Sequence, residues 1–390
     1  MIVTIADDFS GASEIAGIGW RYGLSTEVQL TFDIESNADL VVIDADTRSQ
    51  GKIDAIEKIN ALAKELRNSG HEIALFKKVD SVFRGHIVDE INTLQKHFHF
   101  ERVLLLPANP ARGRKIISGH YLVNGIPLDQ TVFASDPHFP ASSSSVEQII
   151  SGHQTILSHE HLKQNDALPL GKLITGDTGS KEDIKNYINQ TNNKDLCCGG
   201  AECFEAYLEK KGFVDKSSTN KRTFIWPPYT LIISGSTVKD QFDQHSNENL
   251  FPLLSLPGHW QGEQFILNPV EEATWHAEVL SYLRQHKVIA IAIDHEVKRI
   301  KGAGNFSAYF VGLINFISEN IGRQNIHLAI TGGATASDII KNEALSFEVK
   351  QEIAPGVVTL LSKQSKELFT VKPGSYLWPS EFIKTLLTNE

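Results

Sequence analysis

The sequence predicts an α/β protein made of two layered domains with mostly parallel sheets. In the first half, short apolar runs rich in β-branched residues alternate with amphipathic helical segments, which is the pattern of a parallel sheet covered by helices. Strand–turn–helix units start again after a polar, basic stretch at residues 215–222. A chain of 390 residues is long enough for two domains. We therefore expect one domain over residues 1–222, a second over residues 223–390, and a cleft between them.

The chain begins with an apolar run, residues 2–6, that predicts a buried first strand, and Asp7 and Asp8 follow it directly. Ser10 can cap the next helix, expected over residues 12–22, and Gly11 allows a tight turn before it. In open α/β sheets, ligands bind outside the carboxyl ends of the strands. Two carboxylates there suit sugar hydroxyls, a metal ion or proton abstraction. The structural alternative is a pair of aspartates that caps the helix.

The alternation of strands and helices continues through both halves of the chain. Strands are expected at residues 40–43, 73–76, 103–106, 229–233, 288–293, 327–330, 352–361 and 368–374, and helices at 53–67, 86–98, 199–208 and 306–321. Asn124 and Gly125 form a strong hairpin turn signal. The run from Ser158 to His161 could suggest metal ligands, but no further ligand follows nearby, so a surface loop is the favoured interpretation.

Two further polar clusters lie just past strand ends of the first half. They are Lys78, Asp80, Ser81 and Arg84 in one, and Asn109, Arg112 and Arg114 in the other. The planar guanidinium of Arg84 matches a carboxylate, and Lys78 supplies a point charge. Because these strand ends share the edge that carries Asp7 and Asp8, the groups could line one site for a small polyhydroxy acid. The alternative is that Arg84 and Arg114 only neutralise the aspartates as structural ion pairs.

Two glycine-rich turns in the second half point to phosphate binding. They are Ser234–Gly235–Ser236 and Gly332–Gly333–Ala334–Thr335, each placed after an expected strand. The backbone N–H groups of such turns favour phosphate, although either turn alone could simply turn the chain. No Gly-x-x-x-x-Gly-Lys-Ser/Thr loop is present, which excludes a P-loop enzyme. Residues 302–307 match a dinucleotide fingerprint only partly, so an ordinary helix start is favoured there.

The composition restricts the partners. The chain has 37 Lys and Arg against 47 Asp and Glu, and its formal net charge of -10 argues against a nucleic-acid or anionic-membrane partner. A local basic pocket for a small acid is still compatible with that charge. Cys197, Cys198 and Cys203 are too close for a strain-free bridge and too few for a zinc site, so reduced thiols in a cytoplasmic protein are expected. We see no signal segment and no apolar run of membrane-spanning length.

Taken together, these residues resemble the four-carbon acid sugar kinase family. The resembling segments, in the family's order over nearly the whole chain, are residues 6–12, 78–85, 107–114, 119–128, 332–335, 355–356 and 372–374. The resemblance implies a kinase that uses ATP to phosphorylate threonate, erythronate or 3-oxo-tetronate at the terminal hydroxyl. It also implies that the N-terminal domain holds the sugar acid and the C-terminal domain holds the nucleotide. Mg2+ would arrive with the ATP phosphates, so no protein ligand is assigned to it.

Carried over residue by residue, the resemblance gives a set of candidate site residues. The substrate-binding residues would be Asp7, Ser10, Lys78, Ser81, Arg84, Asn109 and Arg114, and the ATP-binding residues would be Ser236, Gly332, Gly333, Ala334, Thr335 and Gly374. Successive strand residues point to opposite sides, and Asp8 is nearer the turn than Asp7. We therefore expect Asp8 at the reacting hydroxyl as the base, with Asp80 as the next catalytic candidate. A homodimer is left open.

The chain departs from the family pattern at two places. Ala334 stands where the family turn usually has an acidic residue, and residues 235–238 lack the second serine of the family's Gly-Ser-x-Ser pattern. A non-catalytic sugar-acid-binding or regulatory homologue is therefore the alternative to a kinase. A third hypothesis, based on Asp7 and Asp8 after the first strand, is a phosphatase with an aspartate nucleophile. Such an enzyme would release phosphate from sugar phosphates without ATP.

Overall fold

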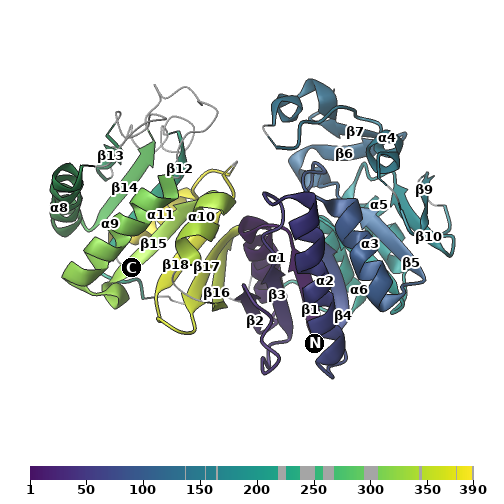
Figure 1. Cartoon of the computed structure of the whole chain (residues 1–390), viewed down its shortest axis with the longest axis horizontal. Helices are drawn as coiled ribbons and strands as arrows, with labels where there is room; N and C mark the ends of the chain where they lie inside the picture. Colours follow the sequence, from purple (N-terminus) through teal and green to yellow (C-terminus); the bar gives the residue numbers. More distant parts are fainter. Residues whose placement is uncertain are drawn as a thin grey trace. The chain divides into compact units, whose positions relative to one another are not determined.

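The computed structural model describes residues 1–136, 138–153, 155–163, 166–217, 225–237, 251–257, 268–293, 306–341, 345–374 and 376–388. The chain divides into two compact units, residues 1–219 (unit 1) and residues 220–390 (unit 2). Each unit combines a sheet with packed helices (Figure 1), so the predicted α/β class is confirmed. No helix among these residues is long and apolar enough to cross a membrane.

Unit 1 is built on a sheet with the strand order β2–β3–β1–β4–β11–β5–β10–β9, in which neighbouring strands are parallel. The strands are β1 (Ile2–Ala6), β2 (Thr26–Gln29), β3 (Leu40–Asp44), β4 (Ala74–Lys78), β5 (Arg102–Leu106), β9 (Ser158–Leu162), β10 (Lys172–Gly176) and β11 (Asp195–Gly199). The helices are α1 (Phe9–Arg21), α2 (Lys52–Asn68), α3 (Ile87–Phe98), α4 (Val146–Ser151), α5 (Lys181–Asn189) and α6 (Ala201–Lys210). Because the strands share one direction, their carboxyl ends lie at one edge of the sheet.

The two faces of this sheet have separate cores, because successive strand residues point to opposite sides. Val3 and Ile5 of β1 lie in a buried apolar cluster with residues of α2 and α3. On the other face, Phe76 of β4 meets Phe204 of α6 edge to face, with ring centroids 4.9 Å apart. The strands are therefore held on both sides, and they form a rigid frame for the loops at their ends.

The three cysteines are free and belong to the core of unit 1. Cys197 and Cys198 lie on β11 and Cys203 on α6, and all three are buried. Burial raises the pKa of the Cys197 thiol to about 11. At neutral pH these side chains therefore remain thiols that fill space.

A small antiparallel sheet follows β5. Its strands are β6 (Arg114–Ile117), β7 (His120–Val123) and β8 (Ile126–Pro127), and short 3-10 helices lie at Pro110–Arg112, Leu128–Gln130 and Val132–Ser135. Asn124 and Gly125 join β7 to β8 with φ of 52° and 81°. Positive φ at both positions is the requirement of a type I′ hairpin turn, so the predicted hairpin is confirmed.

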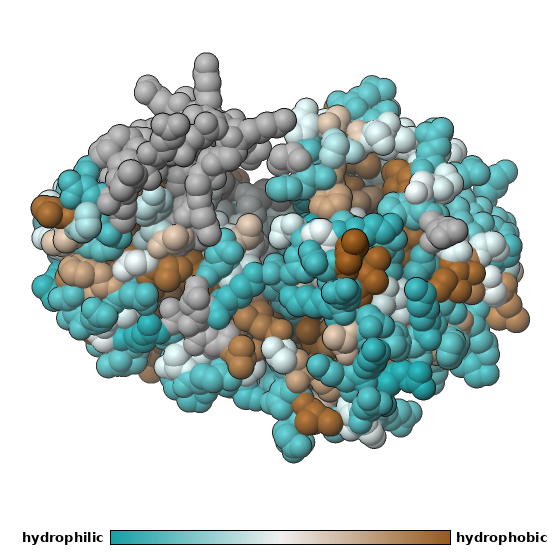
Figure 2. Space-filling view, in the orientation of Figure 1, coloured by the Kyte–Doolittle hydropathy of each residue, from teal (hydrophilic) through white to brown (hydrophobic). Residues whose placement is uncertain are grey.

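Unit 2 has the strand order β13–β14–β12–β15–β18–β17–β16. The strands are β12 (Tyr229–Thr237), β13 (Leu253–Ser255), β14 (Val288–Ile293), β15 (Ile326–Thr331), β16 (Ser346–Ala354), β17 (Val357–Ser362) and β18 (Leu368–Lys372). The helices are α8 (Pro269–His286), α9 (Phe306–Ile321), α10 (Gly333–Ile340) and α11 (Ser380–Thr388). A 3-10 turn lies at Arg323–Asn325. The strands from β13 to β18 pair in parallel, whereas β16 and β17 are antiparallel additions. On the face shown in Figure 2, hydrophobic residues lie in small groups among hydrophilic ones.

Two sequence-based expectations about elements are wrong. The run from Ser158 to His161 is part of edge strand β9 and not a surface loop, because it pairs in parallel with β10. His159 and His161 both hydrogen-bond Thr175 Oγ1 of β10, at 2.9 Å each. Residues 352–361 form two antiparallel strands and not one, because Gly356 turns the chain with a φ of 80°. Of the partial fingerprint at residues 302–307, residues 302–305 lie outside the described residues, and α9 begins at residue 306.

Candidate functional site

The first part of the site is the end of β1, where Asp8 caps α1. Its backbone is extended, with a φ of -148°, and its Oδ1 accepts the Gly11 N–H at 3.0 Å. The Ser10 hydroxyl donates to Asp8 Oδ2 at 2.6 Å. Because α1 begins at Phe9, the cap is Asp8 and not Ser10 as the sequence suggested. Asp8 therefore does cap the helix, as the structural alternative from the sequence proposed, and Ser10 donates a hydrogen bond to the same carboxylate.

Arg48, which sequence reasoning assigned no role, is the centre of this region. Its Nε lies 2.7 Å from Asp7 Oδ2, and its Nη2 lies 2.9 Å from Asp7 Oδ1 and 2.8 Å from Asp8 Oδ1. The same Nη2 is 3.7 Å from Asp80 Oδ1. The Asp7 carbonyl in turn accepts the N–H groups of Thr47 and Arg48, at 3.0 and 3.1 Å. One guanidinium therefore ties the ends of β1, β3 and β4 together.

Asp7 and Asp8 reach the same guanidinium, although the sequence analysis expected them to point to opposite sides. The alternation rule applies within a strand, and β1 ends at Ala6. Burial alone would raise the pKa of Asp7, but the adjacent Arg48 guanidinium reverses this and holds that pKa below its usual value. Asp7 is therefore a charged, buried group of the site at neutral pH.

Asp80 and Arg84 form the second part of the site. The Nη2 and Nε atoms of Arg84 lie 3.0 and 3.1 Å from the two oxygens of Asp80, and Asp80 Oδ2 also accepts the Val82 N–H at 3.1 Å. Burial would raise the pKa of Asp80, but the Arg48 and Arg84 guanidinium groups hold it far below its usual value. The turn between them contains Phe83 with a φ of 63°, an unusual backbone for a bulky residue. Arg84 therefore neutralises Asp80 in an ion pair, as the structural alternative from the sequence proposed.

Arg114 differs from Arg84 because no carboxylate of the described residues lies against it. Its Nη1 donates to the Ser81 hydroxyl, and its guanidinium lies 5.8 Å from the Phe133 ring centroid. Its backbone is fixed by hydrogen bonds with Asn109, of 2.9 and 3.1 Å. The Tyr121 hydroxyl donates to the Ser81 carbonyl and supports the same corner. Arg114 is thus a cation that is held in place without being neutralised.

Two lysines at the end of β4 complete the charge pattern. Lys78 is 5% exposed, and its Nζ donates to the Val79 carbonyl at 3.1 Å, next to Glu14 at 3.8 Å. Lys77 is fully buried and pairs with Glu90 of α3 at 2.7 Å. The Thr47 hydroxyl donates to the same Glu90 carboxylate at 2.6 Å. This buried pair anchors the loop that presents Arg48.

The structure brings the sequence-predicted residues of the first half together at the carboxyl edge of β1, β4 and β5. They are Asp7, Asp8, Ser10, Lys78, Asp80, Ser81, Arg84, Asn109 and Arg114, joined by Arg48 from the end of β3. Arg112 is exposed. A signal for Arg48 does exist in the sequence. Arg48 comes shortly after the strand at residues 40–44, as Asp7 comes directly after the first strand. Because β3 pairs in parallel with β1, the residues that follow the two strands lie at the same edge of the sheet.

In unit 2, the glycine turns after three adjacent strands come together. A Cβ on Gly235, near the end of β12, would lie only 2.0 Å from Thr335 Oγ1, and a Cβ on Gly374, after β18, would lie 3.8 Å from Gly332 Cα. Gly332 has a φ of 96°, and its N–H donates to the Lys372 carbonyl at 2.9 Å. Helix α10 starts directly after it, at Gly333, with Ala334 in its first turn. The side chain of Ser236 lies outside the described residues.

The glycine turns leave backbone N–H groups at the N-terminus of α10, a position that favours anions such as phosphate. Within the described ranges, no group of three or more His, Cys, Asp or Glu side chains could hold a metal ion. The aspartates at the edge of unit 1 already contact guanidinium groups at 2.7–3.0 Å. The groups on offer are therefore carboxylate acceptors and the Arg114 cation in unit 1, and backbone N–H donors in unit 2.

The fold and the site define the class of the protein: a two-unit α/β protein with a charged cluster at the strand ends of its first unit. A family model described as the sugar-binding N-terminal domain matches residues 2–206, which is more than half of the chain. The chain belongs to this family.

Curated relatives of this chain are named as kinases of four-carbon acids. It is 31% identical to a D-threonate kinase of Salmonella typhimurium over 166 residues, covering 42% of this chain and 39% of the relative. It is 33% identical to a 3-oxo-tetronate kinase of Brucella melitensis over 153 residues, covering 37% and 35%. The matched segment thus spans less than half the length of these relatives. A 3-oxo-tetronate kinase of Actinobacillus succinogenes is 23% identical over 96% of both chains.

Solved structures share the fold over nearly the whole chain. A Haemophilus influenzae protein of the DUF1537 family has a TM-score of 0.74 at 20% identity, and a Salmonella typhimurium protein has a TM-score of 0.79 at 17% identity. Each comparison covers 98% of both chains. At such identities the similarity shows the fold alone.

Proposed function

We propose that this protein is a cytoplasmic ATP-dependent kinase that phosphorylates the terminal hydroxyl of a four-carbon acid sugar of the threonate, erythronate or 3-oxo-tetronate type. The names of the curated relatives support the reaction class. In this chain, the single observation that carries the proposal is the cluster in which Arg48 joins Asp7, Asp8 and Asp80 within the sugar-binding unit. Such a cluster offers both acceptors for hydroxyls and cations for a carboxylate.

Arg114 is the proposed partner of the substrate carboxylate. Arg84, the first choice from the sequence, already uses its bidentate face on Asp80. The Arg114 guanidinium donates only to the Ser81 hydroxyl among the described residues and lies over Phe133, so a substrate carboxylate would meet an oriented cation without displacing another anion. Asn109 fixes the backbone of Arg114 and lies beside it to hydrogen-bond a substrate hydroxyl.

Asp8 is the proposed group at the reacting hydroxyl. Its side chain is 16% exposed, compared with 3% for Asp7 and 7% for Asp80, so it is the most accessible of the three carboxylates. Asp80 is a poor base because its pKa is held far below the usual value. In phosphoryl transfer the protein mostly positions the reactants and stabilises charge. Asp8 would orient the terminal hydroxyl and accept its proton as the phosphoryl group arrives.

The α10 turn is the proposed phosphate site for ATP. The N–H groups at Gly333 and Ala334 are in the first turn of the helix, and Thr335 adds a hydroxyl beside Gly235. Gly374, close to Gly332, leaves room for a nucleotide at the same edge. Mg2+ bound to the ATP phosphates would neutralise their charge, and no protein ligand is assigned to it.

One observation favours a second candidate, a non-catalytic sugar-acid-binding or regulatory homologue. The first turn of α10 contains no acidic residue, and Ala334 occupies the position where the kinase family usually has one. Such a protein would keep the acid site of unit 1 and bind its ligand without turnover.

A screen for ATP-dependent phosphorylation separates the two candidates. The purified protein is incubated with ATP, Mg2+ and each of D-threonate, D-erythronate and 3-oxo-tetronate, and ADP release is followed together with the phosphorus NMR spectrum. A kinase gives ADP release that depends on one of the acids, with a new phosphomonoester signal. Acid-induced thermal stabilisation without any phosphomonoester supports the binding protein instead.

A further inference from the structure

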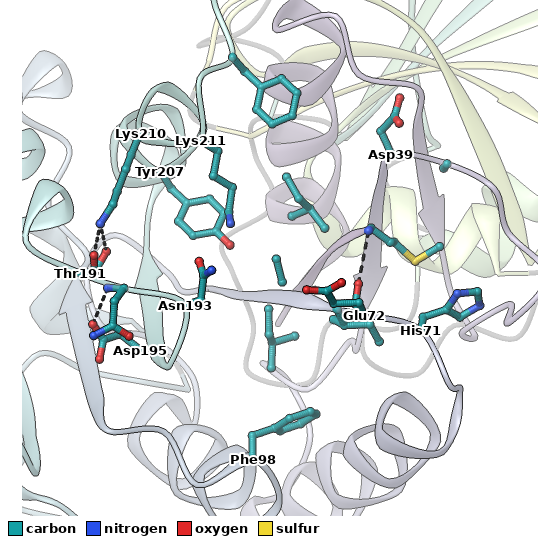
Figure 3. A pocket seen from close by; sticks show the side chains of 18 of the residues that line it. Asp39, His71, Glu72, Phe98, Thr191, Asn193, Asp195, Tyr207, Lys210 and Lys211 are labelled. Atoms are coloured by element: carbon teal, nitrogen blue, oxygen red, sulfur yellow. Dashed lines mark hydrogen bonds between the residues drawn. The ribbon is translucent and has the colours of Figure 1, made fainter.

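A large pocket lies at the amino-terminal edge of the unit 1 sheet, opposite the carboxylate cluster. Its volume is about 1050 Å³, at the upper end of the volumes of ligand clefts. The first residues of β1, β4 and β11 line it, together with the ends of α3 and α6 (Figure 3). A five-residue strand separates the two edges by roughly 15 Å. The pocket is therefore distinct from the proposed acid-sugar site.

Apolar and aromatic side chains form the floor of this pocket, and polar side chains surround them. Ile2 and Leu75 lie at the starts of β1 and β4 and are 6% and 7% exposed. Phe98 and Phe100 stack with their ring centroids 5.7 Å apart and an interplanar angle of 21°. A polyhydroxy acid would leave these surfaces without an apolar partner. A ligand with a flat aromatic body fits them better.

One side of the pocket carries a cation and a hydroxyl whose binding capacity is unused. Lys211 Nζ lies 4.9 Å from the centroid of the Tyr207 ring and pairs with no carboxylate of the described residues. The Tyr207 hydroxyl makes no hydrogen bond within the described part of the chain. Figure 3 shows both groups next to Asn193 on the same side. The neighbouring Lys210 is different, since it donates to the Ile188 carbonyl at 2.9 Å.

The other side of the pocket is acidic. In Figure 3, Glu72 and Asp39 lie away from Lys211, across the apolar floor. The N-terminal ammonium of Met1 also lines the pocket and donates to the Glu72 carbonyl at 3.4 Å, so it offsets one of these two carboxylates. The remaining negative charge disfavours a second anionic group on a bound ligand. The charge pattern therefore selects a ligand with a single anionic group, placed at the Lys211 side.

We propose that this pocket binds a small aryl monocarboxylate. The aromatic body lies on the apolar floor beside Phe98 and Phe100, and the carboxylate accepts hydrogen bonds from Lys211 Nζ and the Tyr207 hydroxyl. Such a ligand differs in class from the proposed acid sugar, which is covered with hydroxyls. The site is therefore a second small-molecule site, and it stands whether or not the kinase proposal is correct.

Isothermal titration calorimetry with 2-naphthoate tests the site on the full chain. The neutral analogue 2-naphthamide reports on the anionic group. Lys211→Gln removes the cation, and Asn193→Trp places a large side chain at the pocket wall. Lys194→Gln is the matched control, because Lys194 is an exposed lysine that pairs with Glu101 at 2.7 Å and does not line the pocket. Melting temperatures of all variants confirm that they fold.

We expect one saturable 2-naphthoate site per chain. Its affinity should fall by about two- to fivefold in Lys211→Gln, as for loss of an exposed charge pair, and stay unchanged in Lys194→Gln. Binding should disappear in Asn193→Trp and be several-fold weaker for the neutral amide. The proposal is overturned if the wild type shows no saturable binding, or if Lys211→Gln or the amide binds as tightly as the wild type binds 2-naphthoate.

Discussion

The carboxyl edges of the two sheets differ in the groups that they expose, because charged side chains lie at the first edge and glycine turns at the second. In unit 1 the strand ends carry long charged side chains, and the single side chain of Arg48 contacts both Asp7 and Asp8 within 2.9 Å. In unit 2 the strand ends carry glycines, and the groups on offer are the backbone N–H groups at the start of α10. A sugar acid with several hydroxyls needs oriented side chains, whereas a phosphate can be held by backbone. The difference predicts which substitutions damage which ligand.

The two edges also differ in how they depend on charge. At the first edge, burial works against the aspartates, and the arginines keep their pKa values low. Removing one cation there leaves a buried carboxylate without compensation. At the second edge, the conformation of Gly332 rather than a side-chain charge shapes the site. Charge variants should therefore act mainly on unit 1, and changes of backbone shape mainly on unit 2.

Asp8→Asn should have the largest effect on turnover. Asparagine caps a helix as well as aspartate does, so α1 and the fold should survive. It cannot accept the hydroxyl proton, and loss of such a group lowers kcat by roughly 10²–10⁴. Steady-state kinetics with the acid identified in the screen give kcat, and calorimetry gives the affinity for the acid, which should be retained. A kcat within about threefold of the wild type would remove Asp8 from the reacting hydroxyl.

Arg48→Ala should have the largest effect on stability. The change leaves the buried Asp7 carboxylate without its partner, and breaking such a pair costs about 3–5 kcal/mol. Urea unfolding measures the loss, with Arg67→Ala, an exposed arginine of α2, as the matched control. Adding Asp7→Asn to Arg48→Ala should restore part of the stability, because the lone charge is then absent. Equal stability of Arg48→Ala and the control would contradict the role of Arg48.

Gly332→Ala should weaken ATP use with a smaller effect on stability. Gly332 has φ and ψ of 96° and 134°, a conformation that costs other residues roughly 1–3 kcal/mol. Distortion of the turn should raise the KM for ATP by about tenfold, or 1.4 kcal/mol, and leave the KM for the acid unchanged. Gly322→Ala is the matched control, because Gly322 has nearly the same backbone angles, 83° and 130°, outside the turn. Equal changes of the KM for ATP in both variants would contradict the role of Gly332 in the ATP site.

A further expected effect, which develops only as the solution is made acid, is a pH dependence of stability that comes from His327 of unit 2. This side chain is fully buried between Thr230 and Thr370, and burial lowers its pKa to about 3. The unfolded state, with a pKa of about 6.5, binds the proton more tightly. The free energy of unfolding should therefore be greatest above pH 6.5 and fall by about 1.4 kcal/mol for each pH unit between 6.5 and 3.

His327→Gln tests this pH dependence. The glutamine amide can still hydrogen-bond the two threonines but does not titrate. Urea unfolding between pH 7.5 and about 5 should show a weaker acid-dependent loss than in the wild type. The exposed His286 provides the control substitution, and we expect it to leave the slope unchanged. Identical slopes for the wild type and His327→Gln would contradict the lowered pKa, because His327 would then bind its proton equally well in the folded and unfolded states.

Short sequence patterns predicted much of the fold and of the charged cluster at the carboxyl edge of the unit 1 sheet. The apolar run at residues 2–6 and the hairpin at Asn124–Gly125 follow from neighbours in sequence, and both are confirmed. Edge strand β9 was missed because its parallel pairing with β10 cannot be seen in residues 158–161 themselves. A short polar strand has little signal of its own.

The partners of the charged residues could not be read from the sequence. Arg48 meets Asp7 only because β3 lies beside β1, a fact of strand order. The sequence favoured Arg84 as the partner of a carboxylate, although Arg114 carries the same guanidinium group. Only their positions distinguish them, since Arg84 is paired with Asp80 and Arg114 is not.

The binding of each ligand to Arg114→Ala tests the account most directly, because this residue is the proposed link between the charged edge and the acid. Calorimetry measures the affinity of D-erythronate and of a non-hydrolysable ATP analogue for the wild type, Arg114→Ala and Gly332→Ala. Loss of one charge-assisted contact costs about 1.5–3 kcal/mol, so Arg114→Ala should weaken acid binding by roughly ten- to a hundredfold and leave the nucleotide affinity unchanged. Gly332→Ala should show the reverse pattern. Parallel losses of both ligands in either folded variant, or unchanged acid binding in Arg114→Ala, would contradict the assignment of the acid to unit 1 and the nucleotide to unit 2.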